Sequence, residues 1–222
     1  MFTKTRSTNR NKKYKQTAYY QITKNPYRSI KYDKGKCGEY LIYKRLKRFE
    51  SNGGKFLFNL YIPKPNNETT EIDLILICSK GLLVFESKNY GGWIFGNEAN
   101  QNWTQVFPKG RGRSHKERFY NPIRQNATHL RHLKRLIGDS FPVRSIIVFS
   151  DECTLKDVTV RSSNVIVVNR YNVLSAVTQI YDQTQDDVLT PNEIDDLYGR
   201  LHPYTQVSFD TIEKHTSNIQ NY

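Results

Sequence analysis

The sequence predicts a mixed α/β fold, with a central mixed sheet flanked by helices. Strand-like apolar segments crowd residues 55–88, an amphipathic helical segment begins at Asn121-Pro122, and Val143–Phe149 is apolar enough to be a strand buried on both faces. A helix between two strands lets the second strand lie parallel to a neighbour, so parallel and antiparallel pairs should occur together. A chain of 222 residues is long enough to bury such a core without a disulfide or a structural metal.

The first predicted helix runs from Asp33 to about Ser51. Asp33 is a favourable N-terminal cap, and Gly53-Gly54 ends the segment. The apolar residues at helical spacing are Leu41, Ile42, Leu46 and Phe49. Glu39 lies one turn into this helix, where an acid suits either the helix dipole or a ligand role toward the sheet.

The next segments predict an antiparallel meander, two shorter strands and a basic loop. Turns rich in proline, glycine and asparagine separate the apolar runs. The expected strands are Lys55–Ile62, Glu71–Ile77, Leu82–Lys88, Gly92–Phe95 and Trp103–Phe107. The Arg- and Gly-rich segment Lys109–Arg118 is expected to be a loop.

The second long helix is predicted from both of its ends. Asn121 is a good cap, Pro122 suits the first helical position, and Gly138 stops the helix. Its expected buried stripe is Ile123, Ala127, Leu130, Leu133 and Ile137.

Residues 151–222 are expected to form a short α/β extension packed on, or continuing, the same domain. Val165–Val168 is a candidate strand, and Thr190 begins a capping box that opens a helix to about Leu201. Eight acids against Arg200 make residues 182–213 acidic, which makes this segment a candidate surface for a protein partner or for a homo-oligomer.

The positive charge of the chain is concentrated in two segments. The net charge is +13, from 34 Lys and Arg against 21 Asp and Glu. Met1–Tyr32 has nine basic residues and no acid, and Pro108–Arg135 has nine basic residues against Glu117 alone. The rest of the chain therefore sums to -4. Two basic segments suit a polyanion such as nucleic acid, because Lys and Arg at phosphates release condensed counterions.

Residues 1–32 are polar and lack sustained periodicity, so we expect a basic, flexible N-terminal arm. Either nucleic-acid binding or a solubilising leader would account for its charge. The domain proper is expected to span residues 33–150.

Several classes of protein are not expected from this composition. The apolar runs are far shorter than the roughly 18–20 residues that span a bilayer, and no apolar signal segment follows the N-terminal charges. The three cysteines, Cys37, Cys78 and Cys153, form neither a C-x-x-C pair nor an even disulfide framework. We therefore expect a cytoplasmic protein without a membrane span.

Two of the predicted strands bring acids and a lysine to one place. Residues two apart on a strand point to the same face, so Glu86 and Lys88 are presented together, and a meander can place Asp73 beside Glu86. Converging carboxylates can hold Mg²⁺, which lowers the pKa of a bound water and neutralises phosphate charge, while a lysine positions that water. An exposed cross-strand ion pair is the alternative that this pattern alone leaves open.

Six short motifs follow one another along the chain: Gly35-x-x-Gly38-Glu39, Glu71-Ile72-Asp73, Phe85-Glu86-Ser87-Lys88, Gly92-Trp93-Ile94-Phe95-Gly96, Trp103-Thr104-Gln105 and Asn121-Pro122-x-x-Gln125-Asn126. In order and approximate spacing they resemble the motifs of the NERD (nuclease-related) domain, a family placed in the PD-(D/E)XK nuclease superfamily. The resemblance covers about Asp33 to Phe149 and implies a restriction-endonuclease-like core.

The resemblance also implies roles for individual residues. Glu39, Asp73 and Glu86 would bind the metal, Mg²⁺ or alternatively Mn²⁺. Lys88 would be the catalytic lysine, and Gln125, in the first turn of its helix, would face the same site.

Other motif residues would have supporting roles. Gly35 and Gly38 would let the first helix approach the sheet closely. Trp103 is expected to be a core aromatic, and Gln105 receives no role. Ile72 stands where the superfamily name has proline.

The basic residues near this site are candidates for holding a phosphate backbone. They are Lys109, Arg111, Arg113, Lys116, Arg118, Arg124 and Arg131. His129 and His132 lie three apart on the second helix, but no further Cys or His stands at zinc-ligand spacing, so a solvated or phosphate-facing pair is expected.

These observations predict a Mg²⁺-dependent deoxyribonuclease that hydrolyses DNA phosphodiester bonds. Mobile-element maintenance, DNA processing and defence against foreign DNA are settings that fit. The alternative is a catalytically idle NERD-type module for nucleic-acid binding or assembly. The residues do not distinguish DNA from RNA, because none of them reads the 2′-hydroxyl.

Overall fold

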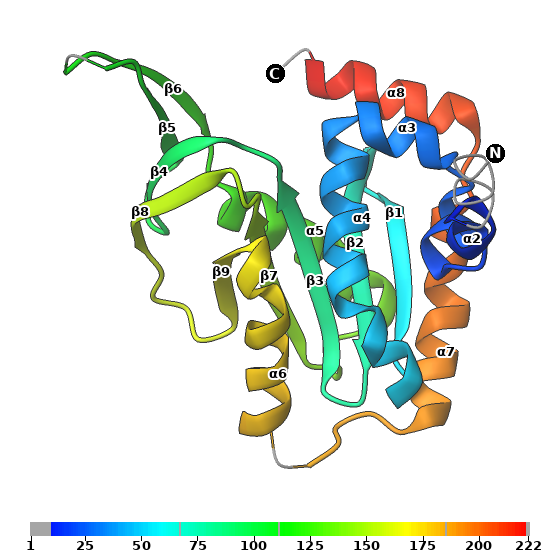
Figure 1. Cartoon of the computed structure of the whole chain (residues 1–222). Helices are drawn as coiled ribbons and strands as arrows, with labels where there is room; N and C mark the ends of the chain where they lie inside the picture. The colour runs from blue at the N-terminus through cyan, green and yellow to red at the C-terminus, as the bar shows by residue number, and fades with distance from the viewer. Residues whose placement is uncertain (1–9, 67, 111, 185, 221–222) are drawn as a thin grey trace.

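The computed structural model describes residues 10–66, 68–110, 112–184 and 186–220, and it confirms the predicted mixed α/β class (Figure 1). The described strands form two sheets flanked by helices. The first sheet has the order β1 (Lys55–Pro63), β2 (Thr69–Cys78), β3 (Gly81–Lys88), β7 (Val143–Phe149) and β9 (Val165–Asn169). The second has the order β6 (Ser114–Tyr120), β5 (Asn102–Pro108), β4 (Gly92–Asn97) and β8 (Cys153–Thr159).

The first sheet is antiparallel on one side and parallel on the other. β1, β2 and β3 form the expected meander, in which Leu74 lies opposite Phe85. β7 pairs parallel to β3 after a crossover through β4, β5, β6 and α5, and β9 pairs parallel to β7 after a crossover through β8. The strands in the middle are buried on both faces, which explains the continuous apolar run Leu74–Cys78.

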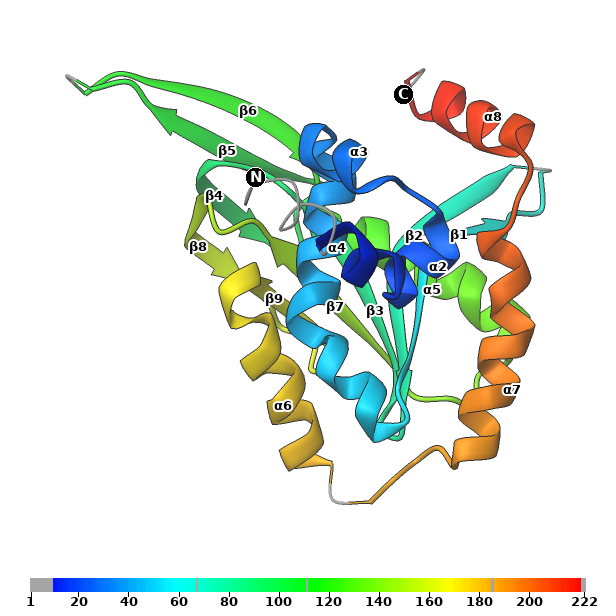
Figure 2. The same cartoon turned by 45° about the vertical axis from the view of Figure 1, so that its right-hand side comes forward.

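Helices cover both faces of the first sheet (Figures 1 and 2). The long helices are α4 (Lys34–Leu46), α5 (Pro122–Ile137), α6 (Val173–Gln183), α7 (Pro191–Leu201) and α8 (Phe209–Gln220). The shorter helices are α2 (Ala18–Thr23), α3 (Tyr27–Tyr32), η1 (Lys47–Asn52), η2 (Arg170–Asn172) and η3 (His202–Thr205). α4 and α6 lie on one face and α5 on the other. Among the described residues, none of the helices combines the length and the apolar character that crossing a bilayer requires.

The ends of α4 and α5 follow the sequence expectations. The Asp33 carboxylate caps α4 by accepting the Lys36 N–H, and the Asn121 side chain caps α5 by accepting the Ile123 N–H. α5 ends at Gly138, whose φ of 93° few other residues adopt. Ala127 is exposed, contrary to the predicted stripe.

Residues 10–32 are not the flexible arm that we expected. They contain α2 and α3, and the side chains of Tyr14, Tyr19, Ile22 and Ile30 are buried in the main core. Tyrosine carries a hydroxyl but buries a large ring when it packs, and the many basic residues of this segment concealed its aromatic contacts with the core. Residues 1–9 of the predicted arm lie outside the described residues.

The prediction that Lys109–Arg118 forms a loop is wrong for part of the segment. Its second half, residues 114–118, belongs to β6, which pairs antiparallel with β5 and projects with it from the body as a hairpin (Figure 1). β6 is exposed along nearly its whole length, so no apolar alternation marks it in the sequence. Main-chain pairing with β5 makes this segment a strand.

The C-terminal region has more structure than predicted. The capping box at Thr190 and the helix after it are confirmed, whereas β8, α6 and α8 were not anticipated. Part of the acidic segment pairs within the chain: Asp195 lies 2.6 Å from Lys55 Nζ, and Asp187 lies 3.0 Å from Lys80 Nζ.

Candidate active site

The carboxyl end of β3 gathers most of the predicted catalytic residues. Glu86 and Lys88 point to the side of α5, where Gln125 and His129 meet them. Asp73 belongs to the adjacent strand β2, and its Oδ2 accepts the Ser87 N–H at 2.7 Å. The antiparallel register of β2 and β3 produces this meeting, because Leu74 and Phe85 are paired directly beside the two acids.

Glu86 is enclosed and held from two sides. Its Oε1 lies 2.7 Å from Lys88 Nζ, and its Oε2 lies 3.2 Å from His129 Nε2. Burial alone would raise the pKa of Glu86, but Lys88 and His129 outweigh it and hold that pKa at about 2. Glu86 is therefore a carboxylate, and its buried ion pair rules out the exposed pair considered from the sequence.

Lys88 connects this acid to α5. Its ammonium also donates to Gln125 Oε1 at 2.9 Å, so Gln125 lies beside Lys88. Burial acts to lower the pKa of Lys88, but the Glu86 carboxylate more than compensates and raises it. Lys88 is thus a charged donor.

His129 is a site residue that the sequence did not reveal. We expected it to be solvated or to face a phosphate, but its side chain is buried, with Nε2 toward Glu86 and Nδ1 2.6 Å from the Thr70 hydroxyl. His132 is buried as well, and its Nδ1 lies 3.5 Å from an Arg135 nitrogen. The helical spacing of His129 from Gln125, one turn apart, was the available signal.

The surroundings of Asp73 disfavour the charged form of its carboxyl group. Burial raises its pKa well above the usual range, and the neighbouring carboxylates of Glu86 and Glu39 raise it further. The Ser87 N–H and Lys88 oppose this rise without cancelling it. A cation between these acids would relieve the repulsion.

Glu39 approaches the site from α4. Its Oε2 accepts from Asn59 Nδ2 at 3.1 Å and from the Tyr19 hydroxyl at 3.5 Å. Burial raises the pKa of Glu39 to about 8, with a further rise from Glu71 that the Asn59 bond opposes. A hollow of about 670 Å³ opens beside Glu39, and its lining also includes Lys36.

Gly38 allows α4 to lie this close to β3. A Cβ atom on Gly38 would stand 2.5 Å from the Ser87 hydroxyl, whereas one on Gly35 would meet only Asp33 at ordinary contact distance. The expectation of close approach is therefore confirmed for Gly38 and wrong for Gly35.

Trp103 is the core aromatic that we expected. Its ring stacks on Phe149 and packs against Gly96, where a Cβ atom would lie 2.1 Å from the indole. Gln105, two residues further along β5, is also buried. Its side chain donates to the Gly91 carbonyl at 2.8 Å, which links β5 to the segment between β3 and β4.

The chemistry of the acids fits a divalent cation. Glu86 Oε2 is buried and faces His129 Nε2 at 3.2 Å without hydrogen-bond geometry, and burial and acidic neighbours raise the pKa of Asp73. Among the residues that the structure describes, no three His, Cys, Asp or Glu side chains converge closely enough to form a complete ligand set. Both oxygens of Glu86 face groups of the chain, with Lys88 Nζ at 2.7 Å and His129 Nε2 at 3.2 Å.

The predicted phosphate-binding residues divide into two groups. Lys109, Arg113, Lys116 and Arg118 are exposed on the β5–β6 hairpin. Arg124 and Arg131 are exposed on α5, and Arg124 Nη2 donates to the Ala99 carbonyl at 2.8 Å. Arg111 lies outside the described residues.

A mixed sheet flanked by helices, with acids and a lysine gathered at the end of a central strand, defines a nuclease-like α/β core. Residues 34–150, more than half of the chain, match the model of the nuclease-related domain (NERD). An uncharacterized protein of Bacillus anthracis is 33% identical over 189 residues, which cover 85% of this chain and 84% of that protein. The chain belongs to the nuclease-related domain family.

Proposed function

We propose that this protein is a metal-dependent nuclease that hydrolyses DNA phosphodiester bonds. The observation that carries the proposal is the meeting of Asp73, Glu86, Lys88 and Gln125 at the end of β3, in a member of a nuclease-related family. Burial and the neighbouring carboxylates raise the pKa of Asp73, and acids perturbed in this way cluster at functional sites.

Each residue has a distinct part in this proposal. Asp73 and Glu86, with Glu39 from α4, would hold Mg²⁺ or Mn²⁺. Such a cation supplies a water of lowered pKa and neutralises phosphate charge. Lys88, which contacts Glu86 and Gln125, would donate to a phosphate oxygen or orient the attacking water.

The exposed cations on the hairpin and on α5 would hold the backbone of the nucleic acid. Arg113 and Arg131 are examples from the two elements. Their attraction to phosphates is independent of sequence, so the affinity should fall steeply as salt concentration rises.

A cleavage panel tests the proposal. Purified protein is incubated with supercoiled, linear and single-stranded DNA and with RNA, in Mg²⁺, Mn²⁺ or EDTA. We expect metal-dependent cleavage that Asp73→Asn and Glu86→Gln abolish and that Glu213→Gln, an exposed acid on α8, leaves intact. Nicking of the supercoiled circle identifies endonuclease action.

The same panel can also contradict the nuclease proposal. If no substrate is cut with either metal while DNA is still bound, the catalytically idle module is correct and the nuclease proposal is not. Calorimetry with Mn²⁺ supplies an independent readout, since binding should depend on Asp73 and Glu86.

A further inference from the structure

One face of the second sheet exposes aromatic rings, which is unusual for a solvated sheet. Trp93 is 39% exposed and Phe95 is 36% exposed, whereas Ile94 between them is fully buried. A sheet with one face in water normally places polar residues there. Two large aromatics together on that face therefore indicate an interaction site, which single exposed apolar residues do not.

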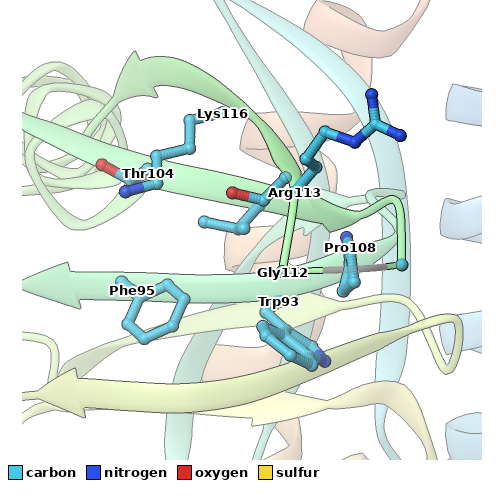
Figure 3. Close-up of a pocket in the computed structure, with 10 residues that line it drawn as sticks. Trp93, Phe95, Thr104, Pro108, Gly112, Arg113 and Lys116 are labelled. Atoms are coloured by element: carbon cyan, nitrogen blue, oxygen red, sulfur yellow. The ribbon is translucent and has the colours of Figure 1, made fainter.

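These rings line a pocket of about 630 Å³ on the outer side of β4, β5 and β6. Figure 3 shows Trp93 and Phe95 side by side along β4, with Arg113 and Lys116 across the pocket. The strand register places Val106 between Trp93 and Lys116, so the floor is apolar and the far edge is basic. We call this surface, which includes Trp93, Phe95, Val106, Arg113 and Lys116, the aromatic face.

Cations surround the aromatic face. Arg113 and Lys116 line the pocket, and no acid is among its described lining residues. Lys156 on β8 places Nζ 4.9 Å from the centroid of the Trp93 ring. Asp157 follows Lys156 on β8 and is paired with Phe95 of β4, but it does not line the pocket.

We infer that the aromatic face binds single-stranded nucleic acid, with bases stacked on Trp93 and Phe95 and phosphates at Arg113, Lys116 and Lys156. Stacking accepts any base, because each has a π-face, and flanking cations track the backbone. A duplex suits the surface poorly, since its bases are stacked on one another and hide those faces.

The position of the face along the chain relates it to the candidate active site. Trp93 follows Lys88 by only five positions, so their Cα atoms can be at most about 18 Å apart. A few nucleotides of an extended strand can bridge that distance. That single strands are also the substrate of cleavage rests on the proposed function. Binding at the aromatic face does not, because it is measurable without cleavage.

The protein carries a built-in probe for this binding. It has two tryptophans, and Trp103 is buried, so Trp93 is the one placed to report on a ligand at the surface. The full chain in EDTA is titrated with an oligothymidylate of about 12 nucleotides and with a duplex of equal length. We expect the single strand to quench the tryptophan fluorescence and the duplex to leave it nearly unchanged.

Variants assign the binding to the two rings. Trp93→Ala and Phe95→Ala should each weaken single-strand binding, measured by fluorescence anisotropy of a labelled oligonucleotide, by roughly ten- to a hundredfold. Trp93→Phe should abolish the quenching but keep most of the binding. Tyr171→Ala removes an exposed aromatic outside the pocket and should change neither. Lys116→Ala should lower the salt dependence by about one counterion.

The outcomes separate this inference from the proposed nuclease. Single-strand binding that depends on Trp93, without cleavage in any metal, supports the aromatic face and removes the nuclease proposal. Cleavage with unchanged single-strand affinity in Trp93→Ala and Phe95→Ala leaves the nuclease and overturns the aromatic face. Sedimentation that shows a dimer dissociated by Trp93→Ala, with no oligonucleotide binding, would assign the face to a second copy of the chain and overturn the inference as well.

Discussion

His129 Nε2 lies 3.2 Å from Glu86 Oε2, and the other ring nitrogen of His129 lies 2.6 Å from the Thr70 hydroxyl. A residue of α5 thereby holds an acid of β3 and is itself held by β2. The conformation of Glu86 consequently depends on how α5 packs on the sheet. Groups that orient a metal-binding carboxylate affect the metal almost as strongly as the ligand itself does.

We expect His129→Ala to weaken Mn²⁺ binding by about 10- to 100-fold, because Glu86 loses the group that fixes its Oε2. Calorimetry measures the affinity, and the cleavage rate should fall with it. His132→Ala is the matched control, since His132 is a buried histidine of the same helix whose ring contacts Arg135. Equal losses in both variants would indicate general loosening of α5 and would contradict this role of His129.

The ion pair of Glu86 and Lys88 should be strongly coupled in the metal-free protein. Both side chains are largely buried, so Lys88→Met leaves the Glu86 carboxylate without its lysine partner and should lower the free energy of unfolding by about 3–5 kcal/mol. Adding Glu86→Gln should recover much of that loss. Urea denaturation of the two single variants and the double variant measures the coupling.

The exposed pair of Asp196 and Arg200 on α7 provides the comparison for this cycle. Such a surface pair should couple by only about 0.3–0.5 kcal/mol. A coupling between Glu86 and Lys88 as small as this would mean that water screens the pair and that the site is open.

Asn59 should reveal backbone strain near the site. It has a φ of 51° within β1, and its side chain donates to Glu39 and Glu71 at 3.1 and 3.3 Å. Both Asn59→Ala and Asn59→Gly lose these bonds, but only alanine resists the left-handed conformation. We expect the alanine variant to be less stable than the glycine variant by about 1 kcal/mol in urea denaturation. Equal stabilities would show that the chain relaxes at this position.

Gly96→Ala should damage the second apolar cluster. The new Cβ would overlap the Trp103 indole, which is enclosed and stacked on Phe149, so we expect the free energy of unfolding to fall by about 1–3 kcal/mol. Gly199→Ala is the control, because Gly199 lies in α7 with open space around it. That change should stabilise the protein by about 0.5–1 kcal/mol. Thermal denaturation of the two variants gives shifts of opposite sign if both assignments hold.

The elements that the sequence predicted best are those with local causes. α5 has its cap, its proline and its terminal glycine within its own residues, and the meander is marked by apolar runs and turns. Glu86 and Lys88 share one side of β3 because of the two-residue repeat of a strand, so their pairing was predictable as well.

The remaining features depend on residues far apart in the chain. β6 is a strand because β5 pairs with it, and residues 14–30 are ordered because Tyr40 and Tyr43 of α4 offer aromatic rings to Tyr14 and Tyr19. No local pattern encodes such contacts, since a polar strand and a basic segment look alike whether or not a partner covers them. The pairing of His129 with Glu86 has the same origin: the sequence determined that an acid and a lysine end β3, and only the packing of α5 on the sheet decided that His129 holds this acid.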